Sequence, residues 1–364
     1  MNAEKAAGTG NLQSAFEAFA QDYFAREKVR HDYGGWFDPV FFDLCEFVGR
    51  KGKRIRPLLL MGAYHAFGGK KKPEDPSVLG AGLAIELLHS FVLIHDDVID
   101  RSDSRRGLPT LHKLASQRFT SIDDRDRLGE NIAMVAGDMV FAMSIRALQG
   151  CDFASEVKGR VLDCFLDYIS DTGAGEIRDI MLGVHDIARV TREDIERMYH
   201  LKTTRYTFEA PCVIGAMLAG ADEGKVEALK RFTAPLGLAF QIQNDLHEFA
   251  NIKPQEPLTS GDLLEGKKTL LLREAYERLN EIEQSFLQMC LSSASRRESA
   301  LLKIQDLIRK SGAVAVMEER SRELFAEAEG VMSSPVFTAG ESVALREAML
   351  LIRRQMRLPG LQSV

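Results

Sequence analysis

The sequence predicts an all-α protein, and three observations support this. Apolar residues recur at the 3.6-residue spacing of helices, most clearly in 81–99, 131–148, 157–169 and 234–249. No run of β-branched residues alternates with the period of two that is typical of half-buried strands. The stretches that interrupt the helical pattern are short and contain glycine or proline, namely 68–73, 105–109, 173–175, 220–224 and 253–261.

Length and composition bound the domain organisation. The chain has 364 residues, of which 45% are hydrophobic, so it could bury one large core or two ordinary domains. Composition alone does not choose between them, but none of the interruptions resembles a long interdomain linker. We therefore predict a single domain over residues 1–364, in which residues 1–40 form a peripheral N-terminal helical segment.

Charge and cysteine usage exclude several classes of protein. The formal net charge of -6 argues against a general nucleic-acid binder, which would show a basic footprint. The five cysteines lack paired spacing, so we expect reduced thiols. The first ten residues carry charge and glycine rather than an apolar core, and we find no stretch resembling a membrane span of about 18 apolar residues. We expect a cytoplasmic protein without a transmembrane segment.

The first candidate site is acidic and ends an apolar helical run. Residues 95–100 read His-Asp-Asp-Val-Ile-Asp. At 100° per residue, Asp96 and Asp100 lie roughly 40° apart on one helix face, with Asp97 beside them. Three carboxylates this close would repel one another unless a cation lay between them, and magnesium suits oxygen ligands. The alternative is a solvated acidic helix end.

The residues that follow favour the metal site. Arg105 and Arg106 come five and six residues after Asp100 and precede Gly107. Guanidinium groups bind phosphate oxygens through two parallel hydrogen bonds. Carboxylate, metal, phosphate and arginine would then form a stack of alternating charge.

A second acidic motif lies about 150 residues further along the chain. In residues 240–248, Asn244 and Glu248 share a helix face, with Gln241 and Asp245 beside it. An amide in place of one carboxylate predicts weaker metal binding than at the first motif. Residues 261–269 then supply another carboxylate and two lysines.

Taken together, these motifs resemble those of the trans-polyprenyl diphosphate synthases, the family that includes farnesyl and geranylgeranyl diphosphate synthases. The resemblance extends over roughly residues 45–350. Chance could supply one of the matching stretches, but hardly all of them in family order. They are 52–57 (Gly-Lys-Arg-Ile-Arg-Pro), 89–100, 105–107, 137–138, 202–203, 240–248 and 262–267.

This resemblance implies a bundle of antiparallel helices around a central cavity, in a homodimer. It implies three Mg²⁺ ions that bridge the allylic diphosphate, with Mn²⁺ as an alternative. By family position, isopentenyl diphosphate would be held by Lys53, Arg56, His89 and Arg106, and the allylic diphosphate by Arg105, Lys202 and Lys267. The metal ligands would be Asp96, Asp97, Asp100, Asn244, Asp245, Glu248 and Asp262.

The same resemblance assigns residues near the reacting atoms. Thr203, Tyr206 and Gln241 occupy the family positions beside the breaking C–O bond, with Asp96, Asp97 and Lys202 completing the catalytic set. Thr203 and Tyr206 could instead be helix-packing residues.

The residue that limits product length is expected about one helical turn before the first motif. Helical spacing alone would choose Val92 as the residue that limits the tail, whereas the family resemblance chooses Phe91. A phenylalanine there indicates a product of fifteen to twenty carbons, and we favour twenty. The alternative is that Phe91 is an ordinary core aromatic residue.

The sequence departs from the family pattern at three positions: Lys51 replaces a glycine, Asn244 an aspartate and Leu258 a lysine. The last two favour a class I terpene cyclase as an alternative, and a non-catalytic partner subunit of a prenyl synthase is a further one. An intact isopentenyl diphosphate set favours the synthase over the cyclase, and the intact first motif argues against the partner subunit. We therefore predict a trans-prenyltransferase that condenses an allylic diphosphate with isopentenyl diphosphate and releases pyrophosphate.

Overall fold

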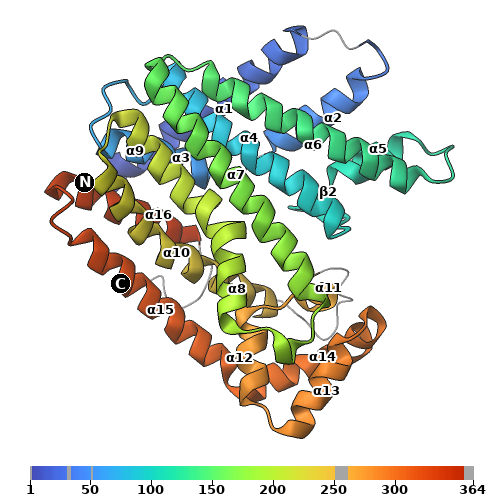
Figure 1. Ribbon diagram of the computed structural model, residues 1–364. Coiled ribbons are helices and arrows are strands. Elements are labelled where there is room, and N and C mark those ends of the chain that lie inside the picture. Colours follow the sequence, from blue (N-terminus) through green and yellow to red (C-terminus); the bar gives the residue numbers. More distant parts are fainter. Residues whose placement is uncertain (1, 31–33, 51, 251–260, 356–364) are drawn as a thin grey trace. The chain divides into compact units, whose positions relative to one another are not determined.

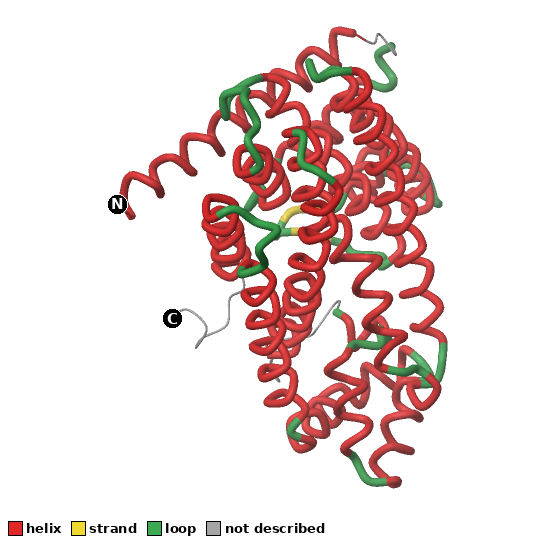
Figure 2. Tube along the Cα trace, turned by 60° about the vertical axis from the view of Figure 1, so that its left-hand side comes forward, coloured by secondary structure: helices red, strands yellow, loops and turns green. Residues whose placement is uncertain are grey.

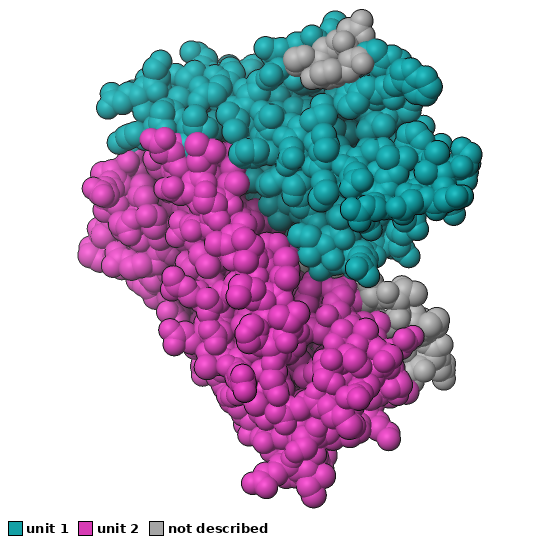
Figure 3. All heavy atoms as spheres, turned by 45° about the vertical axis from the view of Figure 1, so that its right-hand side comes forward, with its two compact units in different colours: residues 1–162, 218–220 teal, residues 163–217, 221–364 magenta. Residues whose placement is uncertain are grey.

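The computed structural model describes residues 2–30, 34–50, 52–250 and 261–355. These residues are almost entirely helical (Figures 1 and 2), and the strands among them are two residues long each and form one antiparallel hairpin. The all-α prediction is confirmed. The chain divides into two compact units, coloured separately in Figure 3: residues 1–162 with 218–220, and residues 163–217 with 221–364.

Unit 1 is built around a core helix, α4, which packs against α3 and α6. Its elements are α1 (Asn2–Arg30), α2 (Asp38–Gly49), α3 (Ile55–Ala66), α4 (Pro76–Ile99), β1 (Ser104–Arg105), β2 (Leu108–Pro109), α5 (Leu111–Arg118), α6 (Arg125–Gln149) and the start of α7 (Ser155–Val184). The N-terminal segment is helical, and α1 buries Phe16 and Tyr23. The Tyr23 hydroxyl donates a hydrogen bond to the Met143 carbonyl of α6 at 3.0 Å.

Unit 2 is built around α10, which packs against α15 and η2. It holds the rest of α7 and the elements η1 (Ile187–Arg189), α8 (Arg192–Tyr199), η2 (His200–Glu209), most of α9 (Ala210–Ala219), α10 (Glu223–Ala250), α11 (Asp262–Glu265), α12 (Leu270–Arg278), α13 (Glu281–Leu291), α14 (Ala294–Ser311), α15 (Ala313–Met332) and α16 (Ala339–Gln355). η1 is a 3-10 helix and η2 is a π-helix.

The start of α4 follows directly from its sequence. Asp75 caps the helix by accepting a hydrogen bond from the Ser77 amide at 2.8 Å, and Pro76 occupies the first turn, where its missing N–H costs nothing. Every residue from 77 to 90 is buried, so the helix is covered on all sides, as its mostly apolar composition requires. α4 then ends at Ile99, which places the first acidic motif in its last turn.

Two helices, α4 and α6, are long and apolar enough to cross a membrane, so the expectation that no stretch resembles a span was wrong on length and composition. The most apolar part of α4 is 83% buried within the protein, and that of α6 is 44% buried. The apolar surface of α4 is therefore covered by protein.

The predicted helical runs all lie within helices: 81–99 in α4, 131–148 in α6, 157–169 in α7 and 234–249 in α10. The break at 68–73 is confirmed as a connection, and 105–109 interrupts the helices as the β1–β2 hairpin. The break at 220–224 is shorter than predicted, because α10 begins at Glu223, and most of 253–261 lies outside the described residues. The break at 173–175 was wrong, because these residues lie inside α7.

Gly175 explains why glycine occurs in the middle of that helix. A Cβ there would lie 2.4 Å from the Lys202 amide nitrogen, so only glycine lets α7 approach the backbone of η2 this closely. Gly237 of α10 serves the same purpose on another side of η2, where a Cβ would lie 2.3 Å from the Thr204 side chain. The π-helix is therefore held by two glycine contacts.

Gly175→Ala is expected to destabilise the protein by about 1–3 kcal/mol, because the added methyl group would push η2 away from α7. Gly173→Ala is the matched control on the same helix. A Cβ at Gly173 meets nothing within 4 Å, and alanine favours helix by about 1 kcal/mol. Urea unfolding of both variants measures the difference, and equal midpoints would contradict this account of Gly175.

Candidate active site

In unit 1, the end of α4 is joined to the hairpin through Arg105. The guanidinium of this residue, on β1, donates to Asp97 Oδ1 at 2.7 Å and to Asp96 Oδ2 at 3.1 Å. The hairpin turns at Arg106 and Gly107, which have φ of +55° and +76°. One cation therefore bridges the two aspartates at the start of the motif.

Asp97 is the most buried residue of the first motif, at 1% exposure. Burial raises the pKa of its carboxyl from 3.8 to about 6, against the opposing effect of the Arg105 hydrogen bond and charge. Its Oδ2 atom is buried and has no hydrogen-bond partner. Arg105 alone therefore does not fully compensate the buried charge of the Asp97 carboxylate.

A cation-rich pocket lies next to this end of α4. It is lined by Phe47, Val48, Arg50, Arg54, Glu86, His89, Ser90, Leu93, Arg105 and Arg106. His89 is buried, and its pKa is held well below 6.5 by burial and by nearby arginines, of which Arg56 is the strongest. Four arginines and one carboxylate line the pocket, so it suits an anion.

Gly52 provides the space for one of these arginines. A Cβ at Gly52 would lie 2.7 Å from the Arg106 guanidinium. The loop before α3 and the hairpin after α4 therefore meet, which places two separate parts of the predicted diphosphate site together. Lys53 is exposed in this loop, and Arg56 lies half-buried in the first turn of α3.

Arg54 is a buried residue that the sequence analysis did not select. It lies at φ +46°, and its guanidinium donates to Glu17 of α1 at 2.8 Å and to Glu86 of α4 at 2.7 Å. This ion triad fixes the loop that carries Lys53 and Arg56.

Phe91 is half-buried on α4 and makes two ring contacts. Its centroid lies 5.4 Å from that of Phe141 on α6 and 4.7 Å from that of His95. His95 also fills the space above Gly137, where a Cβ would lie 2.4 Å from its Nε2 atom. The structure therefore places Phe91 between α4 and α6, while its effect on product length stays a prediction.

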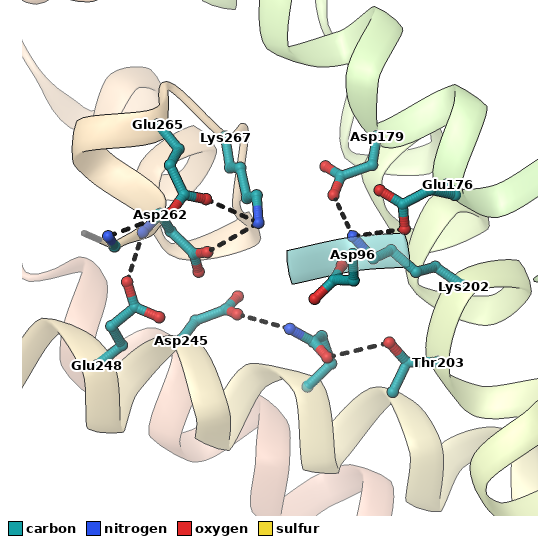
Figure 4. Close-up of polar contacts among 12 residues, drawn as sticks. Asp96, Glu176, Asp179, Lys202, Thr203, Asp245, Glu248, Asp262, Glu265 and Lys267 are labelled. Atoms are coloured by element: carbon teal, nitrogen blue, oxygen red, sulfur yellow. Dashed lines mark hydrogen bonds and ion pairs between the residues drawn. The ribbon is translucent and has the colours of Figure 1, made fainter. Parts of the chain in front are cut away.

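In unit 2, Lys202 lies between two carboxylates of α7 (Figure 4). Its Nζ atom is 2.8 Å from Glu176 and 2.7 Å from Asp179. Lys202 belongs to the π-helix η2, and such wide turns are frequent at functional sites. Asp179 is 6% exposed, and its Oδ1 atom has no hydrogen-bond partner.

A chain of hydrogen bonds joins three further predicted residues (Figure 4). Thr203 donates to Gln241 at 3.2 Å, and Gln241 donates to Asp245 at 3.1 Å. Tyr199 donates to the other Asp245 oxygen at 2.5 Å. Asp245 is buried, and burial and the charge of Asp262 raise its pKa well above 3.8. Tyr206 is buried on η2.

The turn at α11 carries the remaining predicted residues. Lys267 Nζ lies 2.9 Å from Glu265 and 4.0 Å from Asp262, while the Asp262 amide donates to Glu248 at 2.5 Å. Burial and the charge of Glu248 raise the pKa of Asp262 to about 7. Burial also raises the pKa of Glu248.

No group of three described His, Cys, Asp or Glu side chains lies close enough together to hold a metal ion. Asp96 and Asp97 are both paired with Arg105 at the end of α4, and the role of Asp96, Asp97 and Asp100 as metal ligands stays a prediction. The donor set still fits a divalent cation, since buried carboxylates with raised pKa values lack positive charge. Asn244 is exposed on α10, and Leu258 lies outside the described residues.

Sequence reasoning missed Glu176, Asp179 and Tyr199. Glu176 and Asp179 are three residues apart on one helix face, a spacing that brings side chains together much as the four-residue spacing of the acidic motifs does. The signal was present, but 173–175 had been interpreted as a break in the helix. Tyr199 gave no signal, because its partner Asp245 is 46 residues away.

Comparison with known proteins decides the family. Residues 42–308 match the family model described as polyprenyl synthetase. The chain belongs to the polyprenyl synthetase family. It is 32% identical over 264 residues to the geranylgeranyl diphosphate synthase of Sulfolobus acidocaldarius, which covers 71% of this chain and 73% of that enzyme.

Solved structures of this family share the fold. Geranylgeranyl pyrophosphate synthase of Corynebacterium glutamicum, complexed with isoprenyl diphosphate and magnesium, superposes with a TM-score of 0.82 at 25% identity, over 94% of this chain and 98% of that one. Polyprenyl synthase of Caulobacter crescentus, complexed with calcium and isoprenyl diphosphate, has a TM-score of 0.74 at 23% identity, over 94% of each chain. The family and the enzyme class, a prenyltransferase, are as the sequence predicted.

Magnesium is expected to stabilise the protein more at about pH 7.5 than at about pH 5.5. The pKa values of Asp97 and Asp262 are raised, so each folded carboxyl binds its proton more tightly than in the unfolded chain. The stability that each contributes is full below about pH 4 and is lost as pH rises through about 6 and 7. A cation that binds the ionised forms offsets this loss.

Thermal unfolding with and without Mg²⁺ at the two pH values measures this effect. Asp97→Asn should reduce the difference, because its amide cannot titrate. Equal stabilisation by Mg²⁺ at both pH values would contradict metal binding at these carboxylates.

Proposed function

We propose that this protein condenses an allylic diphosphate with isopentenyl diphosphate to a prenyl diphosphate of fifteen to twenty carbons, releasing pyrophosphate. The observation that carries this proposal is the cation-rich pocket beside the first acidic motif, where the buried His89 lies with Arg105 and Arg106. An enzyme that used only one diphosphate would not need this second anion site. Similar proteins also carry the names geranylgeranyl diphosphate synthase and short chain isoprenyl diphosphate synthase.

The residues divide between two substrates. Lys53, Arg56, His89 and Arg106 would bind the isopentenyl diphosphate, while Arg105, Lys202 and Lys267 would bind the allylic diphosphate. Each of the last three is paired with carboxylates in this structure. These cations are therefore already oriented, and a diphosphate would share them with their acidic neighbours.

Divalent cations, three Mg²⁺ in our proposal, would be held by the acidic residues of the two motifs and the α11 turn. Asp96, Asp97 and Asp100 would be metal ligands in unit 1, and Asn244, Asp245, Glu248 and Asp262 would be metal ligands in unit 2. Bound there, the cations supply positive charge that stabilises the leaving pyrophosphate. Two related structures contain magnesium or calcium with isoprenyl diphosphate.

The proposed condensation exchanges one bond for another. The allylic C–O bond breaks and its electron pair leaves with pyrophosphate, while the isopentenyl double bond forms the new C–C bond. The resulting cation loses a proton, which the pyrophosphate accepts. Thr203 and Gln241 are hydrogen-bonded to each other and would orient the allylic diphosphate, with Tyr206 nearby on the same helix.

We propose that the two units form one catalytic domain in the cytoplasm and that the chain acts as a homodimer. An apolar stripe on α7 supports the dimer, because Ile177, Ile180, Met181 and Val184 are 62%, 47%, 55% and 82% exposed at helical spacing. A surface of this kind is suited to an isologous contact with a second copy. Sedimentation of the chain as a monomer at micromolar concentration would argue against it.

The activity assay combines purified protein, Mg²⁺, an allylic diphosphate and isopentenyl diphosphate. A longer diphosphate is expected as the product. Asp96→Ala should reduce turnover by about 10²-fold or more, because an oriented charge at the leaving group is lost. A diphosphate-free hydrocarbon would identify a cyclase, and no product would favour a partner subunit. Full turnover in the presence of EDTA would contradict the metal-dependent mechanism.

Phe91→Ala is expected to lengthen the product by at least one five-carbon unit, because removing the ring opens space between α4 and α6. Chromatography of the dephosphorylated products measures the change. Phe141→Ala is a companion variant, since it removes the other ring of the same tilted pair and opens the same space. If Phe91→Ala lowers stability while the products keep their length, Phe91 is a core residue only.

A further inference from the structure

Lys268 follows the predicted diphosphate ligand Lys267 but lies in a different environment. Its side chain is 2% exposed and is among the largest fully buried side chains in the described residues. Its amine donates to the Gly183 carbonyl, in the last turn of α7, at 3.0 Å and to the Gly266 carbonyl, just after α11, at 2.7 Å. The two lysines of this turn therefore point to different partners.

Both acceptors of Lys268 are neutral. Among the described residues its amine forms no ion pair, and the charged groups that influence it are Arg297 of α14, Asp186 before η1 and Asp179 of α7. Burial, with a contribution from Arg297, lowers the pKa of Lys268 to about 8, against the two aspartates. At neutral pH the ammonium is thus buried at a cost in free energy. An apolar residue would avoid that cost.

The same turn is held from another side by Arg297. This guanidinium donates to the Leu264 carbonyl at 2.8 Å and to the Leu291 carbonyl at 2.9 Å. Gly266 has φ of +83°, and a Cβ on it would lie 2.9 Å from the Arg297 guanidinium. Two carbonyls of the turn therefore accept hydrogen bonds from cationic side chains that are not predicted site residues. Arg297 binds the Leu264 carbonyl, and Lys268 binds the Gly266 carbonyl.

We infer that Lys268 and Arg297 are positioning residues that fix the turn of residues 262–267 against α7 and α14, so that Asp262 and Lys267 are presented to the allylic diphosphate. The role assigned to Asp262 and Lys267 rests on the proposed function, whereas the fixing of the turn does not. Through Gly183, Lys268 also ties the turn to the helix that carries Glu176 and Asp179. The turn is thereby tied to the helix whose carboxylates pair with Lys202.

Lys268→Met tests this role, because methionine keeps the length of the side chain and removes its hydrogen bonds. The KM for the allylic diphosphate should rise roughly tenfold, the size expected for losing a charged hydrogen bond. The KM for isopentenyl diphosphate should not change, and Lys268→Arg should restore most of the allylic KM. The melting temperature should stay within a few degrees, since an apolar residue relieves the buried charge.

Hydrogen exchange provides a readout that does not depend on activity. Amides of residues 262–267 should exchange roughly tenfold faster in Lys268→Met, while the rest of unit 2 stays unchanged. Arg297→Gln should also speed the exchange of the amides of residues 262–267. This variant replaces Lys268→Met in the experiment if Lys268→Met does not fold. Lys303→Met, at an exposed lysine of α14, is the matched control.

The outcomes are distinct. The inference would be overturned if Lys268→Met had the hydrogen-exchange rates and the allylic KM of the native protein. It would also be overturned if both KM values rose equally and the melting temperature fell, because Lys268 would then be a purely structural residue. If the native protein shows no prenyl transfer, the proposed function fails, while faster local exchange would still support the fixed turn.

Discussion

Carboxylates gathered on buried helix faces repel one another, and this protein matches them with cations that each bridge two acids. Arg105 joins Asp96 and Asp97, and Lys202 joins Glu176 and Asp179. A bridging cation satisfies two buried charges with one side chain, which limits the cost of desolvation. The orientation of the candidate site depends on these bridges, because they hold the hairpin to α4 and the π-helix to α7.

Under the proposed function, the same side chains would hold the site together and bind substrate. A diphosphate brings negative charge to cations whose direction is already fixed, so little side-chain entropy is lost on binding. Carboxylates with raised pKa values, such as Asp97 and Asp262, remain short of positive charge. In the proposed function they would be the positions that divalent cations complement.

Glycines set the distances at which these charges can meet. Gly175 brings the backbone of Lys202 against α7, and Gly52 makes room for the Arg106 guanidinium. Gly266 allows Arg297 to approach the α11 turn. In each case an added methyl group would displace the cationic residue, so the absence of a side chain at the glycine helps to set the distances between charges.

The candidate site could be predicted where chemistry depends on neighbours in the chain. The spacing of Asp96, Asp97 and Asp100 indicated an acidic helix end, and Arg105 and Arg106 indicated phosphate. Tyr199, Arg54 and Lys268 could not be found this way, because their partners lie far along the chain or are backbone carbonyls. Asp179 was missed for another reason, since the glycines before it were read as a break.

The sequence by itself determined the helical fold and the family, because periodicity and motif order are local properties. Tertiary structure alone decided which acid each cation meets, which carboxylates are buried enough to have raised pKa values, and which lysine of the pair Lys267 and Lys268 is buried. These properties depend on distances between segments and on exclusion of water. Neither is encoded in spacing along the chain.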